Sequence, residues 1–468
     1  MAGDGRGDRS HPTQLGLPFV EPVSSGEAGV GRSGGPVPPV GESRPARVDG
    51  LWEQVFSASN LERALQRVES NRGAPGVDGM PVDELGPWLT VHLGELLGSL
   101  DEGSFRPSPV RRVEIPKPDG GRRVLGVPTV VDRLIQQAVA QVLTPIFDPG
   151  FSERSFGFRP GRSAHQAVET ARGFVSDGYR WVVDVDLDSF FDRVNHDKLM
   201  FRVARRVADK RLLRLVRRYL ETGVMADGVR QPTGEGTPQG SPLSPLLSNI
   251  MLDDLDRELE GRGHRFVRYA DDLRVFVRSR RAALRVLDGI TVLVESRLKL
   301  KVNRTKSKVV PMTVATLLGF GFYLTTEGVR IRVDPAARRR LKDRIRRLTR
   351  RGGQSLPMRI RRLNRFIAGW MAYFGIADTE SMFRGLDGWL RRRLRAVQWT
   401  LWKTPQRRAK ALRAAGTPPR DAQRLAWTRY GVWRTAHSGL LQRALPNHHW
   451  NRHGLRGFHT HWHRLRNP

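Results

Sequence analysis

Apolar and polar positions are arranged differently in three successive parts of the chain. Residues 1–50 are rich in Gly, Pro and Ser and show no apolar periodicity, which predicts a disordered leader. From 51 to 333, segments with helical spacing alternate with short strand-like segments, and this mixture predicts one α+β region. From 334 onward the pattern is helical, and residues 416–419 (GTPP) predict a linker to a short final module.

The α+β region contains both kinds of periodicity in well-defined segments. Helices are predicted over residues 51–66, 128–143, 243–259 and 282–298, with a helix or helix pair over 199–220. Strands are predicted over residues 181–185, 266–269 and 273–277, and a hairpin over 110–127.

The first half of the C-terminal part carries one continuous apolar stripe. Its residues recur at the i, i+3, i+4, i+7 positions of a single helix face: Leu363, Phe366, Ile367, Trp370, Met371 and Phe374. Leu356 and Pro357 precede this stripe and Gly375 follows it, which agrees with the usual helix start and stop signals.

Net charge identifies the class of partner. The chain carries +33, and residues 335–468 hold 32 Lys and Arg against five Asp and Glu, a net charge of +27. So concentrated an excess predicts a polyanionic partner, nucleic acid in preference to an anionic membrane or to a merely solvated basic face. Eight tryptophans lie in this part; most are expected in the core, and some could stack on unpaired bases: Trp370, Trp389, Trp399, Trp402, Trp427, Trp433, Trp450 and Trp462.

Other classes of protein are disfavoured by what the composition lacks. There is no cysteine, which excludes disulfides and thiolate metal sites. No window approaches the roughly 18 apolar residues of a membrane span, and the N-terminus lacks a signal-peptide core. We therefore expect a cytoplasmic protein that does not contact membranes.

Two groups of carboxylates carry the candidate chemistry. Residues 269–272 (YADD) place two acids at the tip of a predicted hairpin, and the predicted strand 181–185 delivers further acids at its end. Two Mg²⁺ ions held by such carboxylates could clamp the attacking and leaving oxygens of a phosphoryl transfer. A solvated turn is the alternative for 269–272, and spacing alone does not choose Asp186 over Asp188 as a ligand.

Seven ordered segments resemble one known family, the group II intron reverse transcriptases. They are residues 71–79 (NRGAPGVDG), 115–123 (IPKPDGGRR), 155–165 (SFGFRPGRSAH), 186–196 (DLDSFFDRVNH), 237–247 (TPQGSPLSPLL), 269–272 (YADD) and 317–320 (LLGF). Seven such segments in the same order are far more specific than a lone pair of aspartates.

The resemblance implies a right-hand polymerase fold. Fingers and palm would occupy residues 51–333, an all-α thumb called domain X would occupy 334–415, and a small basic DNA-binding tail would occupy 416–468. Relatives that carry an endonuclease continue into a segment with paired cysteines, so no endonuclease is expected here. The histidines near the end are expected to contact nucleic acid rather than zinc: His448, His449, His453, His459, His461 and His463.

The same resemblance assigns the catalytic residues. Asp186, Asp271 and Asp272 fall on the family's catalytic and metal-binding positions, with Asp186 and Asp271 bridging two Mg²⁺ ions and Asp272 supporting them. Asp188 stands where many relatives carry lysine, so no metal-binding role is transferred to it.

Further residues match positions that bind substrate. Lys117 and Arg123 match contacts to the incoming triphosphate, and Gln239 matches a position that seats the nucleotide and template. Phe191 matches an aromatic residue that abuts the sugar and excludes a 2′-hydroxyl. Packing or a loop hydrogen bond is the alternative for Phe191 and Gln239. Five arginines are expected to contact nucleic acid: Arg159, Arg162, Arg361, Arg362 and Arg365.

The expected function is therefore RNA-directed DNA polymerisation coupled to an intron. Such a nucleotidyltransferase would bind its intron RNA to assist splicing, and would copy that RNA from a target DNA primer with deoxynucleoside triphosphates during retrotransposition. One alternative is a related reverse transcriptase freed from any intron and used in defence or repair. Another is an RNA-binding splicing factor without polymerase activity, against which the presence of all three aspartates argues.

Overall fold

The computed structural model describes residues 47–116, 122–226, 229–231, 235–237, 240–350 and 354–467. Ala46–Pro468 forms one compact unit, and the boundaries expected near 333 and 415 stay predictions. Most of the predicted leader lies outside the described residues. Its last residues are not free, because Val48 pairs with Val207 and accepts a 2.8 Å hydrogen bond from the backbone N–H of Ala208.

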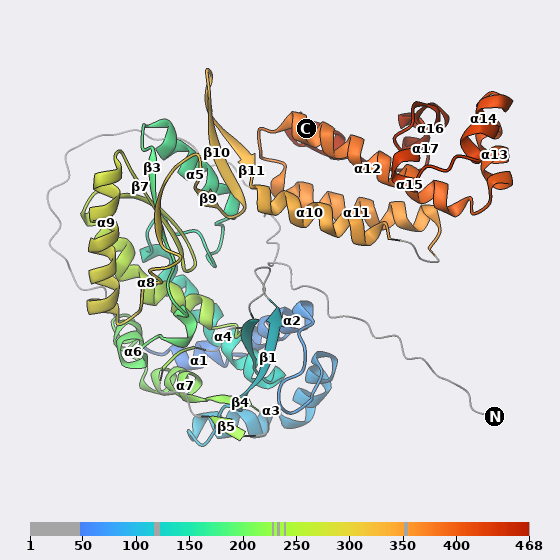
Figure 1. Ribbon diagram of the computed structural model, residues 1–468. Coiled ribbons are helices and arrows are strands. Elements are labelled where there is room, and N and C mark those ends of the chain that lie inside the picture. Colours follow the sequence, from blue (N-terminus) through green and yellow to red (C-terminus); the bar gives the residue numbers. More distant parts are fainter. Residues whose placement is uncertain are drawn as a thin grey trace. The chain divides into compact units, whose positions relative to one another are not determined.

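The N-terminal region is helical and is followed by a small sheet (Figure 1). Its helices are α1 (Leu51–Val55), α2 (Ala58–Asn71), the 3-10 turn η1 (Val82–Glu84), α3 (Leu85–Asp101) and α4 (Val130–Phe147). The single helix expected over 51–66 is two helices, because Ser57 adopts an extended conformation between them. The predicted hairpin is confirmed as β1 (Val110–Pro116) antiparallel to β2 (Arg122–Val127), and β4 (Val224–Ala226) with β5 (Val229–Gln231) extends that sheet.

A second sheet, called here the central sheet, has the strand order β6-β7-β3-β8 and is antiparallel throughout. Its strands are β3 (Trp181–Val185), β6 (Arg265–Tyr269), β7 (Asp272–Val277) and β8 (Lys308–Pro311). The strands expected over 181–185, 266–269 and 273–277 are confirmed, whereas β8 was not foreseen.

Helices cover both faces of the central sheet, as Figure 1 shows. α5 (Ala164–Ser176) packs on one face, and α8 (Ser244–Gly261) with α9 (Arg280–Leu293) packs on the other. Farther out, α6 (His196–Ala204) packs on α8, and α7 (Lys210–Glu221) packs on α6 and α1. The short turns are η2 (Asp148–Gly150), η3 (Phe190–Asp192) and the π turn η4 (Val294–Leu298). Since successive strand residues point to opposite faces, Val183 packs with α8 and α9 while Val182 packs with α5. The second of these faces also carries the acids of β3.

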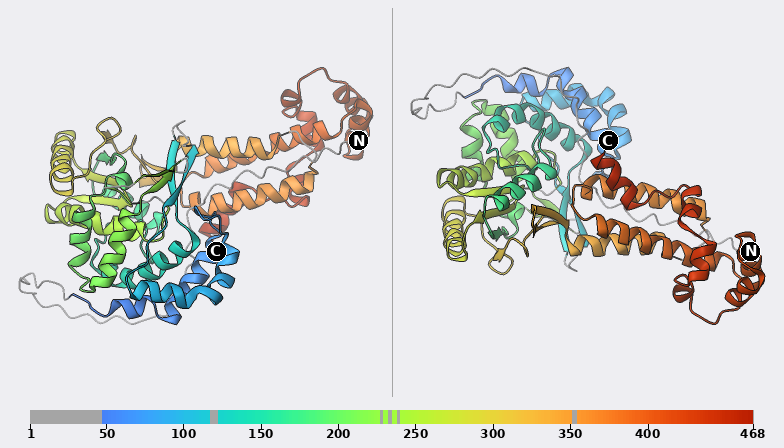
Figure 2. Two further views of the ribbon diagram at one scale, coloured as in Figure 1. Left: turned by 90° about the horizontal axis from the view of Figure 1, so that it is seen from below. Right: turned by 90° about the horizontal axis from the view of Figure 1, so that it is seen from above.

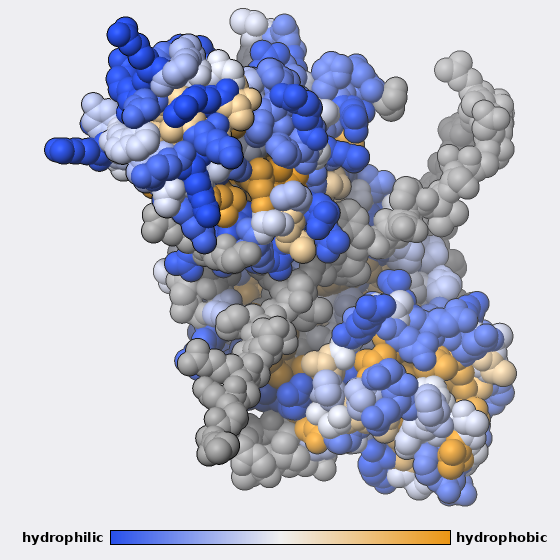
Figure 3. Space-filling view, turned by 90° about the vertical axis from the view of Figure 1, so that its right-hand side faces the viewer, coloured by the Kyte–Doolittle hydropathy of each residue, from blue (hydrophilic) through white to orange (hydrophobic). Residues whose placement is uncertain are grey.

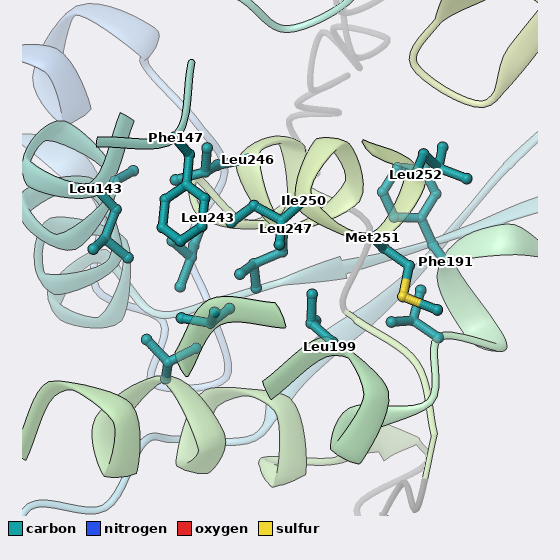
Figure 4. Packing of buried hydrophobic residues seen from close by; sticks show 14 of the residues in the cluster. Leu143, Phe147, Phe191, Leu199, Leu243, Leu246, Leu247, Ile250, Met251 and Leu252 are labelled. Atoms are coloured by element: carbon teal, nitrogen blue, oxygen red, sulfur yellow. The ribbon is translucent and has the colours of Figure 1, made fainter. Parts of the chain in front are cut away.

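One continuous apolar cluster surrounds α8 (Figure 4). Leu143 and Phe147 of α4, Leu199 of α6 and Phe191 of η3 are buried in the same cluster as the apolar residues of α8. Residues 246–252 of the helix are buried on every side, which is typical of a helix segment enclosed by other elements. The helix α8 thus lies in the cluster that joins α4, α6 and η3.

The remaining chain begins with a third sheet and continues as helices. The strands are β9 (Thr316–Leu317), β10 (Phe320–Thr325) and β11 (Gly328–Val333), and the long helices are α10 (Pro335–Leu348), α11 (Leu356–Phe374) and α12 (Glu380–Leu401). The predicted stripe is confirmed on α11, where Leu363, Ile367 and Met371 are buried. Figures 1 and 2 show these helices as neighbours.

The described part of the chain ends in six short helices, of which α15 and α18 pack against α12 and α18 also packs against α11. They are α13 (Pro405–Ala414), α14 (Pro419–Ala426), α15 (Val432–Thr435), α16 (Gly439–Ala444), α17 (Asn447–Arg452) and α18 (Phe458–Arg466). The expected linker at 416–419 is instead a tight turn, in which Gly416 has φ 84° and α13 packs on α14. Asp387 of α12 accepts hydrogen bonds from the N–H groups of Phe458 and His459, which fixes the start of α18. Among the described residues, no helix is long and apolar enough to cross a membrane.

A buried carboxyl group lies at the start of α4. Asp132 is 2% exposed and accepts hydrogen bonds from the Thr129 hydroxyl at 2.7 Å, the Ser108 N–H at 3.1 Å and the Tyr219 hydroxyl at 3.3 Å. Burial raises the pKa of Asp132 to about 6, against its ordinary value of 3.8, because the ionised form loses its hydration.

This carboxyl group predicts a pH-dependent stability. The folded state binds the Asp132 proton more tightly than the unfolded state does. Protonated Asp132 therefore stabilises the fold fully below about pH 4, and this part of the free energy of unfolding is lost as the pH rises through about 6. The loss should be about 3 kcal/mol, and Asp132→Asn should abolish it. Urea unfolding of both proteins across this range measures the difference. A free-energy difference between them that does not change with pH would contradict the assignment.

Candidate functional site

The predicted acidic residues meet at one end of the central sheet. Val185 pairs with Leu273 and Asp184 with Arg274, so the same antiparallel register continued by one residue places Asp186 opposite Asp272. Directly opposed residues share a face, and residues two apart along a strand do so as well. Asp184, Asp186 and Asp272 therefore lie on one face, beside the turn that carries Asp271.

The turn at 270–271 is a two-residue hairpin loop. Tyr269 pairs with Asp272, and of the two residues between them only Ala270 has a positive φ, 57°. This is the pattern of a type II′ turn, whose twist matches that of the flanking strands. A positive φ at a residue with a side chain is unfavourable, so the surrounding structure must hold this turn in place.

A buried arginine holds the turn from behind. Arg268 donates to both oxygens of Asp256 in α8, at 2.7 Å and 2.5 Å, and to the side-chain oxygen of Asn249 at 2.9 Å. The same guanidinium donates to the backbone oxygen of Ala270 at 2.9 Å. Arg268 and Asp256 are both at most 1% exposed, so this ion pair is shielded from water and links α8 directly to the turn.

The segment 155–157 supports the other side of the turn. The Phe156 N–H donates to the Arg268 carbonyl at 2.9 Å, and Asn249 donates to the Gly157 carbonyl at 3.0 Å. A Cβ atom on Gly157 would lie 2.2 Å from the backbone nitrogen of Ala270. Glycine is therefore required here because the two backbones touch. From the sequence, only the family resemblance had pointed to residues 155–165, which include this segment.

Cations neutralise the acidic face. Arg274 lies 2.8 Å from Asp184 and 2.5 Å from Asp272 through the same nitrogen. Lys306 lies 3.7 Å from Asp186, and Lys308 lies 3.9 Å from Asp184. Burial raises the pKa of Asp184, and the Arg274 guanidinium opposes this rise.

None of these cations was predicted as a functional residue. One sequence feature could have pointed to Arg274: it lies two residues after Asp272 in a predicted strand, so both side chains are on the same face of the sheet. The lysines come from β8 and the loop before it, and their proximity depends on a strand pairing that spans more than 120 residues.

The predicted nucleotide-binding residues come from three separate segments. Phe191 is 8% exposed, packs edge-to-face on Phe190 with 5.1 Å between ring centroids, and lies beside Met251 and Leu252 (Figure 4). Its carbonyl accepts a 2.6 Å hydrogen bond from Thr237, at the start of the segment 237–247.

That segment also approaches the first hairpin. A Cβ on Gly240 would be 3.1 Å from the Gly126 carbonyl of β2. Lys117 and Gln239 lie outside the described residues, as does the side chain of Arg123, whose backbone pairs with Ile115.

One of the five arginines expected at nucleic acid has a different role. Arg159 is 6% exposed, and its guanidinium nitrogens donate to Asp148 and to the carbonyls of Ser152, Ser155 and Asp148. No donor is left for a phosphate, so the prediction for Arg159 is wrong and the residue braces its loop.

The other four arginines remain candidates. Arg162 is partly exposed beside Glu153, at 2.6 Å, and Arg361, Arg362 and Arg365 are exposed on α11. The tryptophans divide as expected: Trp399 and Trp450 are buried in the core, whereas Trp427 and Trp433 are 47% and 40% exposed.

The acidic face suits a hard divalent cation in the chemistry of its donors. Carboxylate oxygens are the ligands that Mg²⁺ prefers, and it usually completes its shell with water or substrate phosphates. Asp186 and Asp271 are partly exposed, as a site that receives a substrate requires. Among the described residues, no group of three or more Asp, Glu, His or Cys is arranged so that it could hold a metal ion.

Comparison with known proteins matches most of the described chain. The family profile described as reverse transcriptase (RNA-dependent DNA polymerase) matches residues 115–322, and that of the group II intron maturase-specific domain matches residues 338–416. Protein YkfC of Escherichia coli (strain K12) is 34% identical over 303 residues, which are 56% of this chain and 80% of YkfC.

Two further matches cover smaller parts of the proteins concerned. The group II intron-encoded protein LtrA of Lactococcus lactis is 37% identical over 195 residues, 42% of this chain and 32% of LtrA. A chain of a solved partial Cas6-RT-Cas1–Cas2 complex is 26% identical with a TM-score of 0.35, over 53% of this chain and 42% of that one.

The contact between Gly157 and the turn yields a prediction with a matched control. Gly157→Ala should lower the free energy of unfolding by about 1–3 kcal/mol, because the added carbon meets backbone rather than a movable side chain. It should also speed amide hydrogen exchange in the hairpin of β6 and β7. Gly173→Ala, on the exposed side of α5 with nothing within 4 Å, should be neutral or stabilising. If the two variants had the same free energy of unfolding and the same amide exchange rates, the turn would be able to move away from the added carbon, and the prediction would be wrong.

Proposed function

The chain belongs to the family of group II intron-encoded reverse transcriptases and maturases, and we propose how its own residues serve the reaction of that family. Its enzyme class is RNA-directed DNA polymerase, and the maturase-specific region associates it with intron RNA. The observation that carries the proposal is the convergence of Asp186, Asp271 and Asp272 at one end of the central sheet.

In this proposal the 3′-hydroxyl of a primer attacks the α-phosphate of a deoxynucleoside triphosphate, and pyrophosphate leaves. Asp186 and Asp271 hold the divalent ions that the family uses, which we infer to be two Mg²⁺. When bound, such ions offset the negative charge of the reacting phosphates. Asp272 supports them, since its contact with Arg274 fixes the direction of its carboxylate.

The neighbouring residues prepare the site for a charged substrate. Lys306 partly neutralises Asp186 when no substrate is bound, and its flexible side chain can withdraw when the carboxylate takes up a ligand. Arg274 is 11% exposed and also donates to the Thr316 carbonyl at 3.2 Å, so it stays in place. Lys117 and Arg123, from the first hairpin, are proposed to contact the triphosphate.

The helical part is proposed to hold the nucleic acid. The enzyme binds RNA as a member of this family, and the finer proposal is that Arg361, Arg362 and Arg365 on α11 contact phosphates of the intron RNA or of the primer–template duplex. Target DNA would supply the primer during retrotransposition, and the intron RNA would be both template and splicing substrate.

Removing a proposed metal ligand tests the polymerase assignment. Asp271→Ala should reduce Mg²⁺-dependent extension of a DNA primer on an RNA template on the order of 10²-fold or more, because a fixed charge at the reacting phosphates is lost. Asp188→Ala, whose carboxylate instead pairs with Arg193 at 3.3 Å, should keep most activity. Both variants should bind RNA as the unaltered protein does, measured by filter retention.

The unaltered protein and the two variants together distinguish a polymerase from a splicing factor without polymerase activity. If the unaltered chain binds intron RNA but extends no primer across templates and salts, the splicing factor without polymerase activity becomes the better description. If Asp188→Ala fails as completely as Asp271→Ala, the metal ligands on β3 and its extension have been assigned wrongly.

The sugar-contacting role of Phe191 makes a second prediction. Phe191→Val should raise the relative incorporation of ribonucleotides by about tenfold or more, because a smaller side chain leaves room for the 2′-hydroxyl. Phe191→Tyr keeps the ring and should keep the discrimination. The measurement is kcat/KM for matched ribo- and deoxynucleoside triphosphates. A loss of activity toward both substrates in equal proportion would favour the purely packing role suggested by its burial.

A further inference from the structure

The loop between η4 and β8 runs beside the end of strand β3. Residues 299–307 (KLKVNRTKS) combine cations with short polar side chains, and Asn and Ser are residues typical of turns. The backbone of Val302 pairs with that of Leu187 in an isolated antiparallel bridge. The loop is therefore adjacent to the segment that carries Asp186.

Asn303 folds this loop into a tight turn. Its side-chain oxygen accepts hydrogen bonds from the N–H groups of Thr305 and Lys306, both at 3.2 Å. Its carbonyl accepts hydrogen bonds from the N–H groups of Lys306 and Ser307, at 3.2 and 2.8 Å. An asparagine that accepts from successive N–H groups stabilises a turn in preference to a continued strand. Ser307 is therefore held in place where the loop meets β8.

This turn satisfies both backbone polar groups of Asp186. The Asp186 N–H donates to the Ser307 hydroxyl at 3.0 Å, and the Asp186 carbonyl accepts from the Asn303 N–H at 2.8 Å. The Ser307 hydroxyl also donates to that carbonyl, at 3.3 Å. The pairing of β3 with β8 ends at Asp184 and Lys308, so these bonds begin where the strand ladder stops. The backbone at Asp186 therefore depends on the Ser307 side chain.

We propose that Ser307 is a positioning residue, whose hydroxyl holds the backbone of Asp186 and so sets the direction in which the Asp186 carboxylate meets a divalent ion. A carboxylate just beyond the end of a strand would otherwise adopt several orientations, and metal binding would have to select one of them. Partners that orient a metal ligand contribute to metal affinity without touching the ion. In this proposal Ser307 contacts neither the ion nor the substrate.

The proposal rests on the proposed function for the role of Asp186 as a metal ligand. It adds a residue to which the family resemblance gives no role, because residues 299–307 lie between the resembling segments 269–272 and 317–320.

The first test measures the contact in the metal-free full chain. Ser307→Ala and Ser307→Val remove the hydroxyl, whereas Ser307→Thr keeps it in a side chain of nearly the same shape as valine. Amide hydrogen exchange is followed by mass spectrometry, with fragmentation that isolates the Asp186 amide. We expect this amide to exchange roughly tenfold faster in the alanine and valine variants and at the unaltered rate in the threonine variant.

A matched control is available in the same part of the chain. Ser296→Ala removes an exposed hydroxyl of η4 that donates to the Val292 carbonyl. It should leave the exchange of the Asp186 amide and the extension of a primer unchanged.

The second test measures the Mg²⁺ requirement of primer extension. We expect the Mg²⁺ concentration for half-maximal extension to rise about tenfold in the alanine and valine variants, with a smaller change in kcat at saturating Mg²⁺. Hydrophilic residues prevail on the end of the molecule that carries α13 and α14, as Figure 3 shows, and nucleic-acid binding itself responds to Mg²⁺. Filter retention at each Mg²⁺ concentration therefore accompanies the measurement and should give equal binding for all variants.

Three outcomes would overturn the proposal: unchanged exchange of the Asp186 amide in Ser307→Ala, faster exchange with an unchanged Mg²⁺ requirement, or equal behaviour of the threonine and valine variants. The last would show that the shape of the side chain matters and the hydroxyl does not. A failure of the proposed function is seen separately. If Asp271→Ala extended primers as well as the unaltered chain, the assigned metal ligands would be wrong, whereas faster exchange in Ser307→Ala would still demonstrate the contact with Asp186.

Discussion

The buried contact of Arg268 with Asp256 is the interaction on which the candidate site depends. Arg268 links the helix α8 to the turn at 270–271, because it donates to the Asp256 carboxylate and the Asn249 side chain of α8 and to the Ala270 carbonyl of the turn. Breaking such a pair by removing one partner commonly costs 3–5 kcal/mol, on the order of a large part of a domain's stability, because a buried charge is left uncompensated. What the buried ion pair contributes is a fixed conformation of the turn at 270–271. The positive φ of Ala270 is unfavourable, and apolar packing alone would let this residue move to a more favourable conformation. The directional hydrogen bond from the Arg268 guanidinium to the Ala270 carbonyl holds the turn in its observed conformation. Since Phe191 packs on the same helix α8, one rigid element sets the positions of both the acids and the proposed sugar contact.

A second constraint is electrostatic. Adjacent carboxylates on one sheet face repel each other, and folding them together requires compensating charge before any metal or substrate arrives. Arg274 supplies the permanent part, because it is nearly buried between Asp184 and Asp272. Lys306 supplies an exchangeable part beside Asp186, where the side chain is 60% exposed and free to move. Asp186 therefore remains available to a ligand, while Asp184 and Asp272 are held in place by Arg274.

The sequence predicted the elements that depend on local periodicity and missed what depends on distant pairing. The strand 181–185 was identified because apolar alternation is a property of neighbouring residues. The acids of 269–272 stood out in the sequence itself as the tip of a predicted hairpin, whereas the choice of Asp186 over Asp188 needed the family resemblance because spacing alone left the two equivalent. Lys306 could not have been placed at the site, because its position follows from the pairing of β8 with β3. The interpretation of Arg159 failed for a related reason: exposure cannot be read from charge, and here a nearby Asp148 and several carbonyls draw the side chain inward.

The basic helical part and the acidic sheet are joined by apolar packing rather than by attraction between their charges. His165 of α5 meets the Tyr373 carbonyl at 2.7 Å, and the Tyr373 hydroxyl donates to Leu318 at 2.9 Å. Burial raises the pKa of Tyr373 to about 12, so this donor keeps its proton at any pH at which the protein is folded. The same apolar cluster runs from Val182 of the central sheet to Phe458 of the last helix. Because the 32 Lys and Arg of residues 335–468 are accompanied by only five Asp and Glu, most of these cations have no acidic partner within that segment, which favours binding of a polyanion. One compact unit thus contains both a strongly cationic helical part and a carboxylate-lined sheet end.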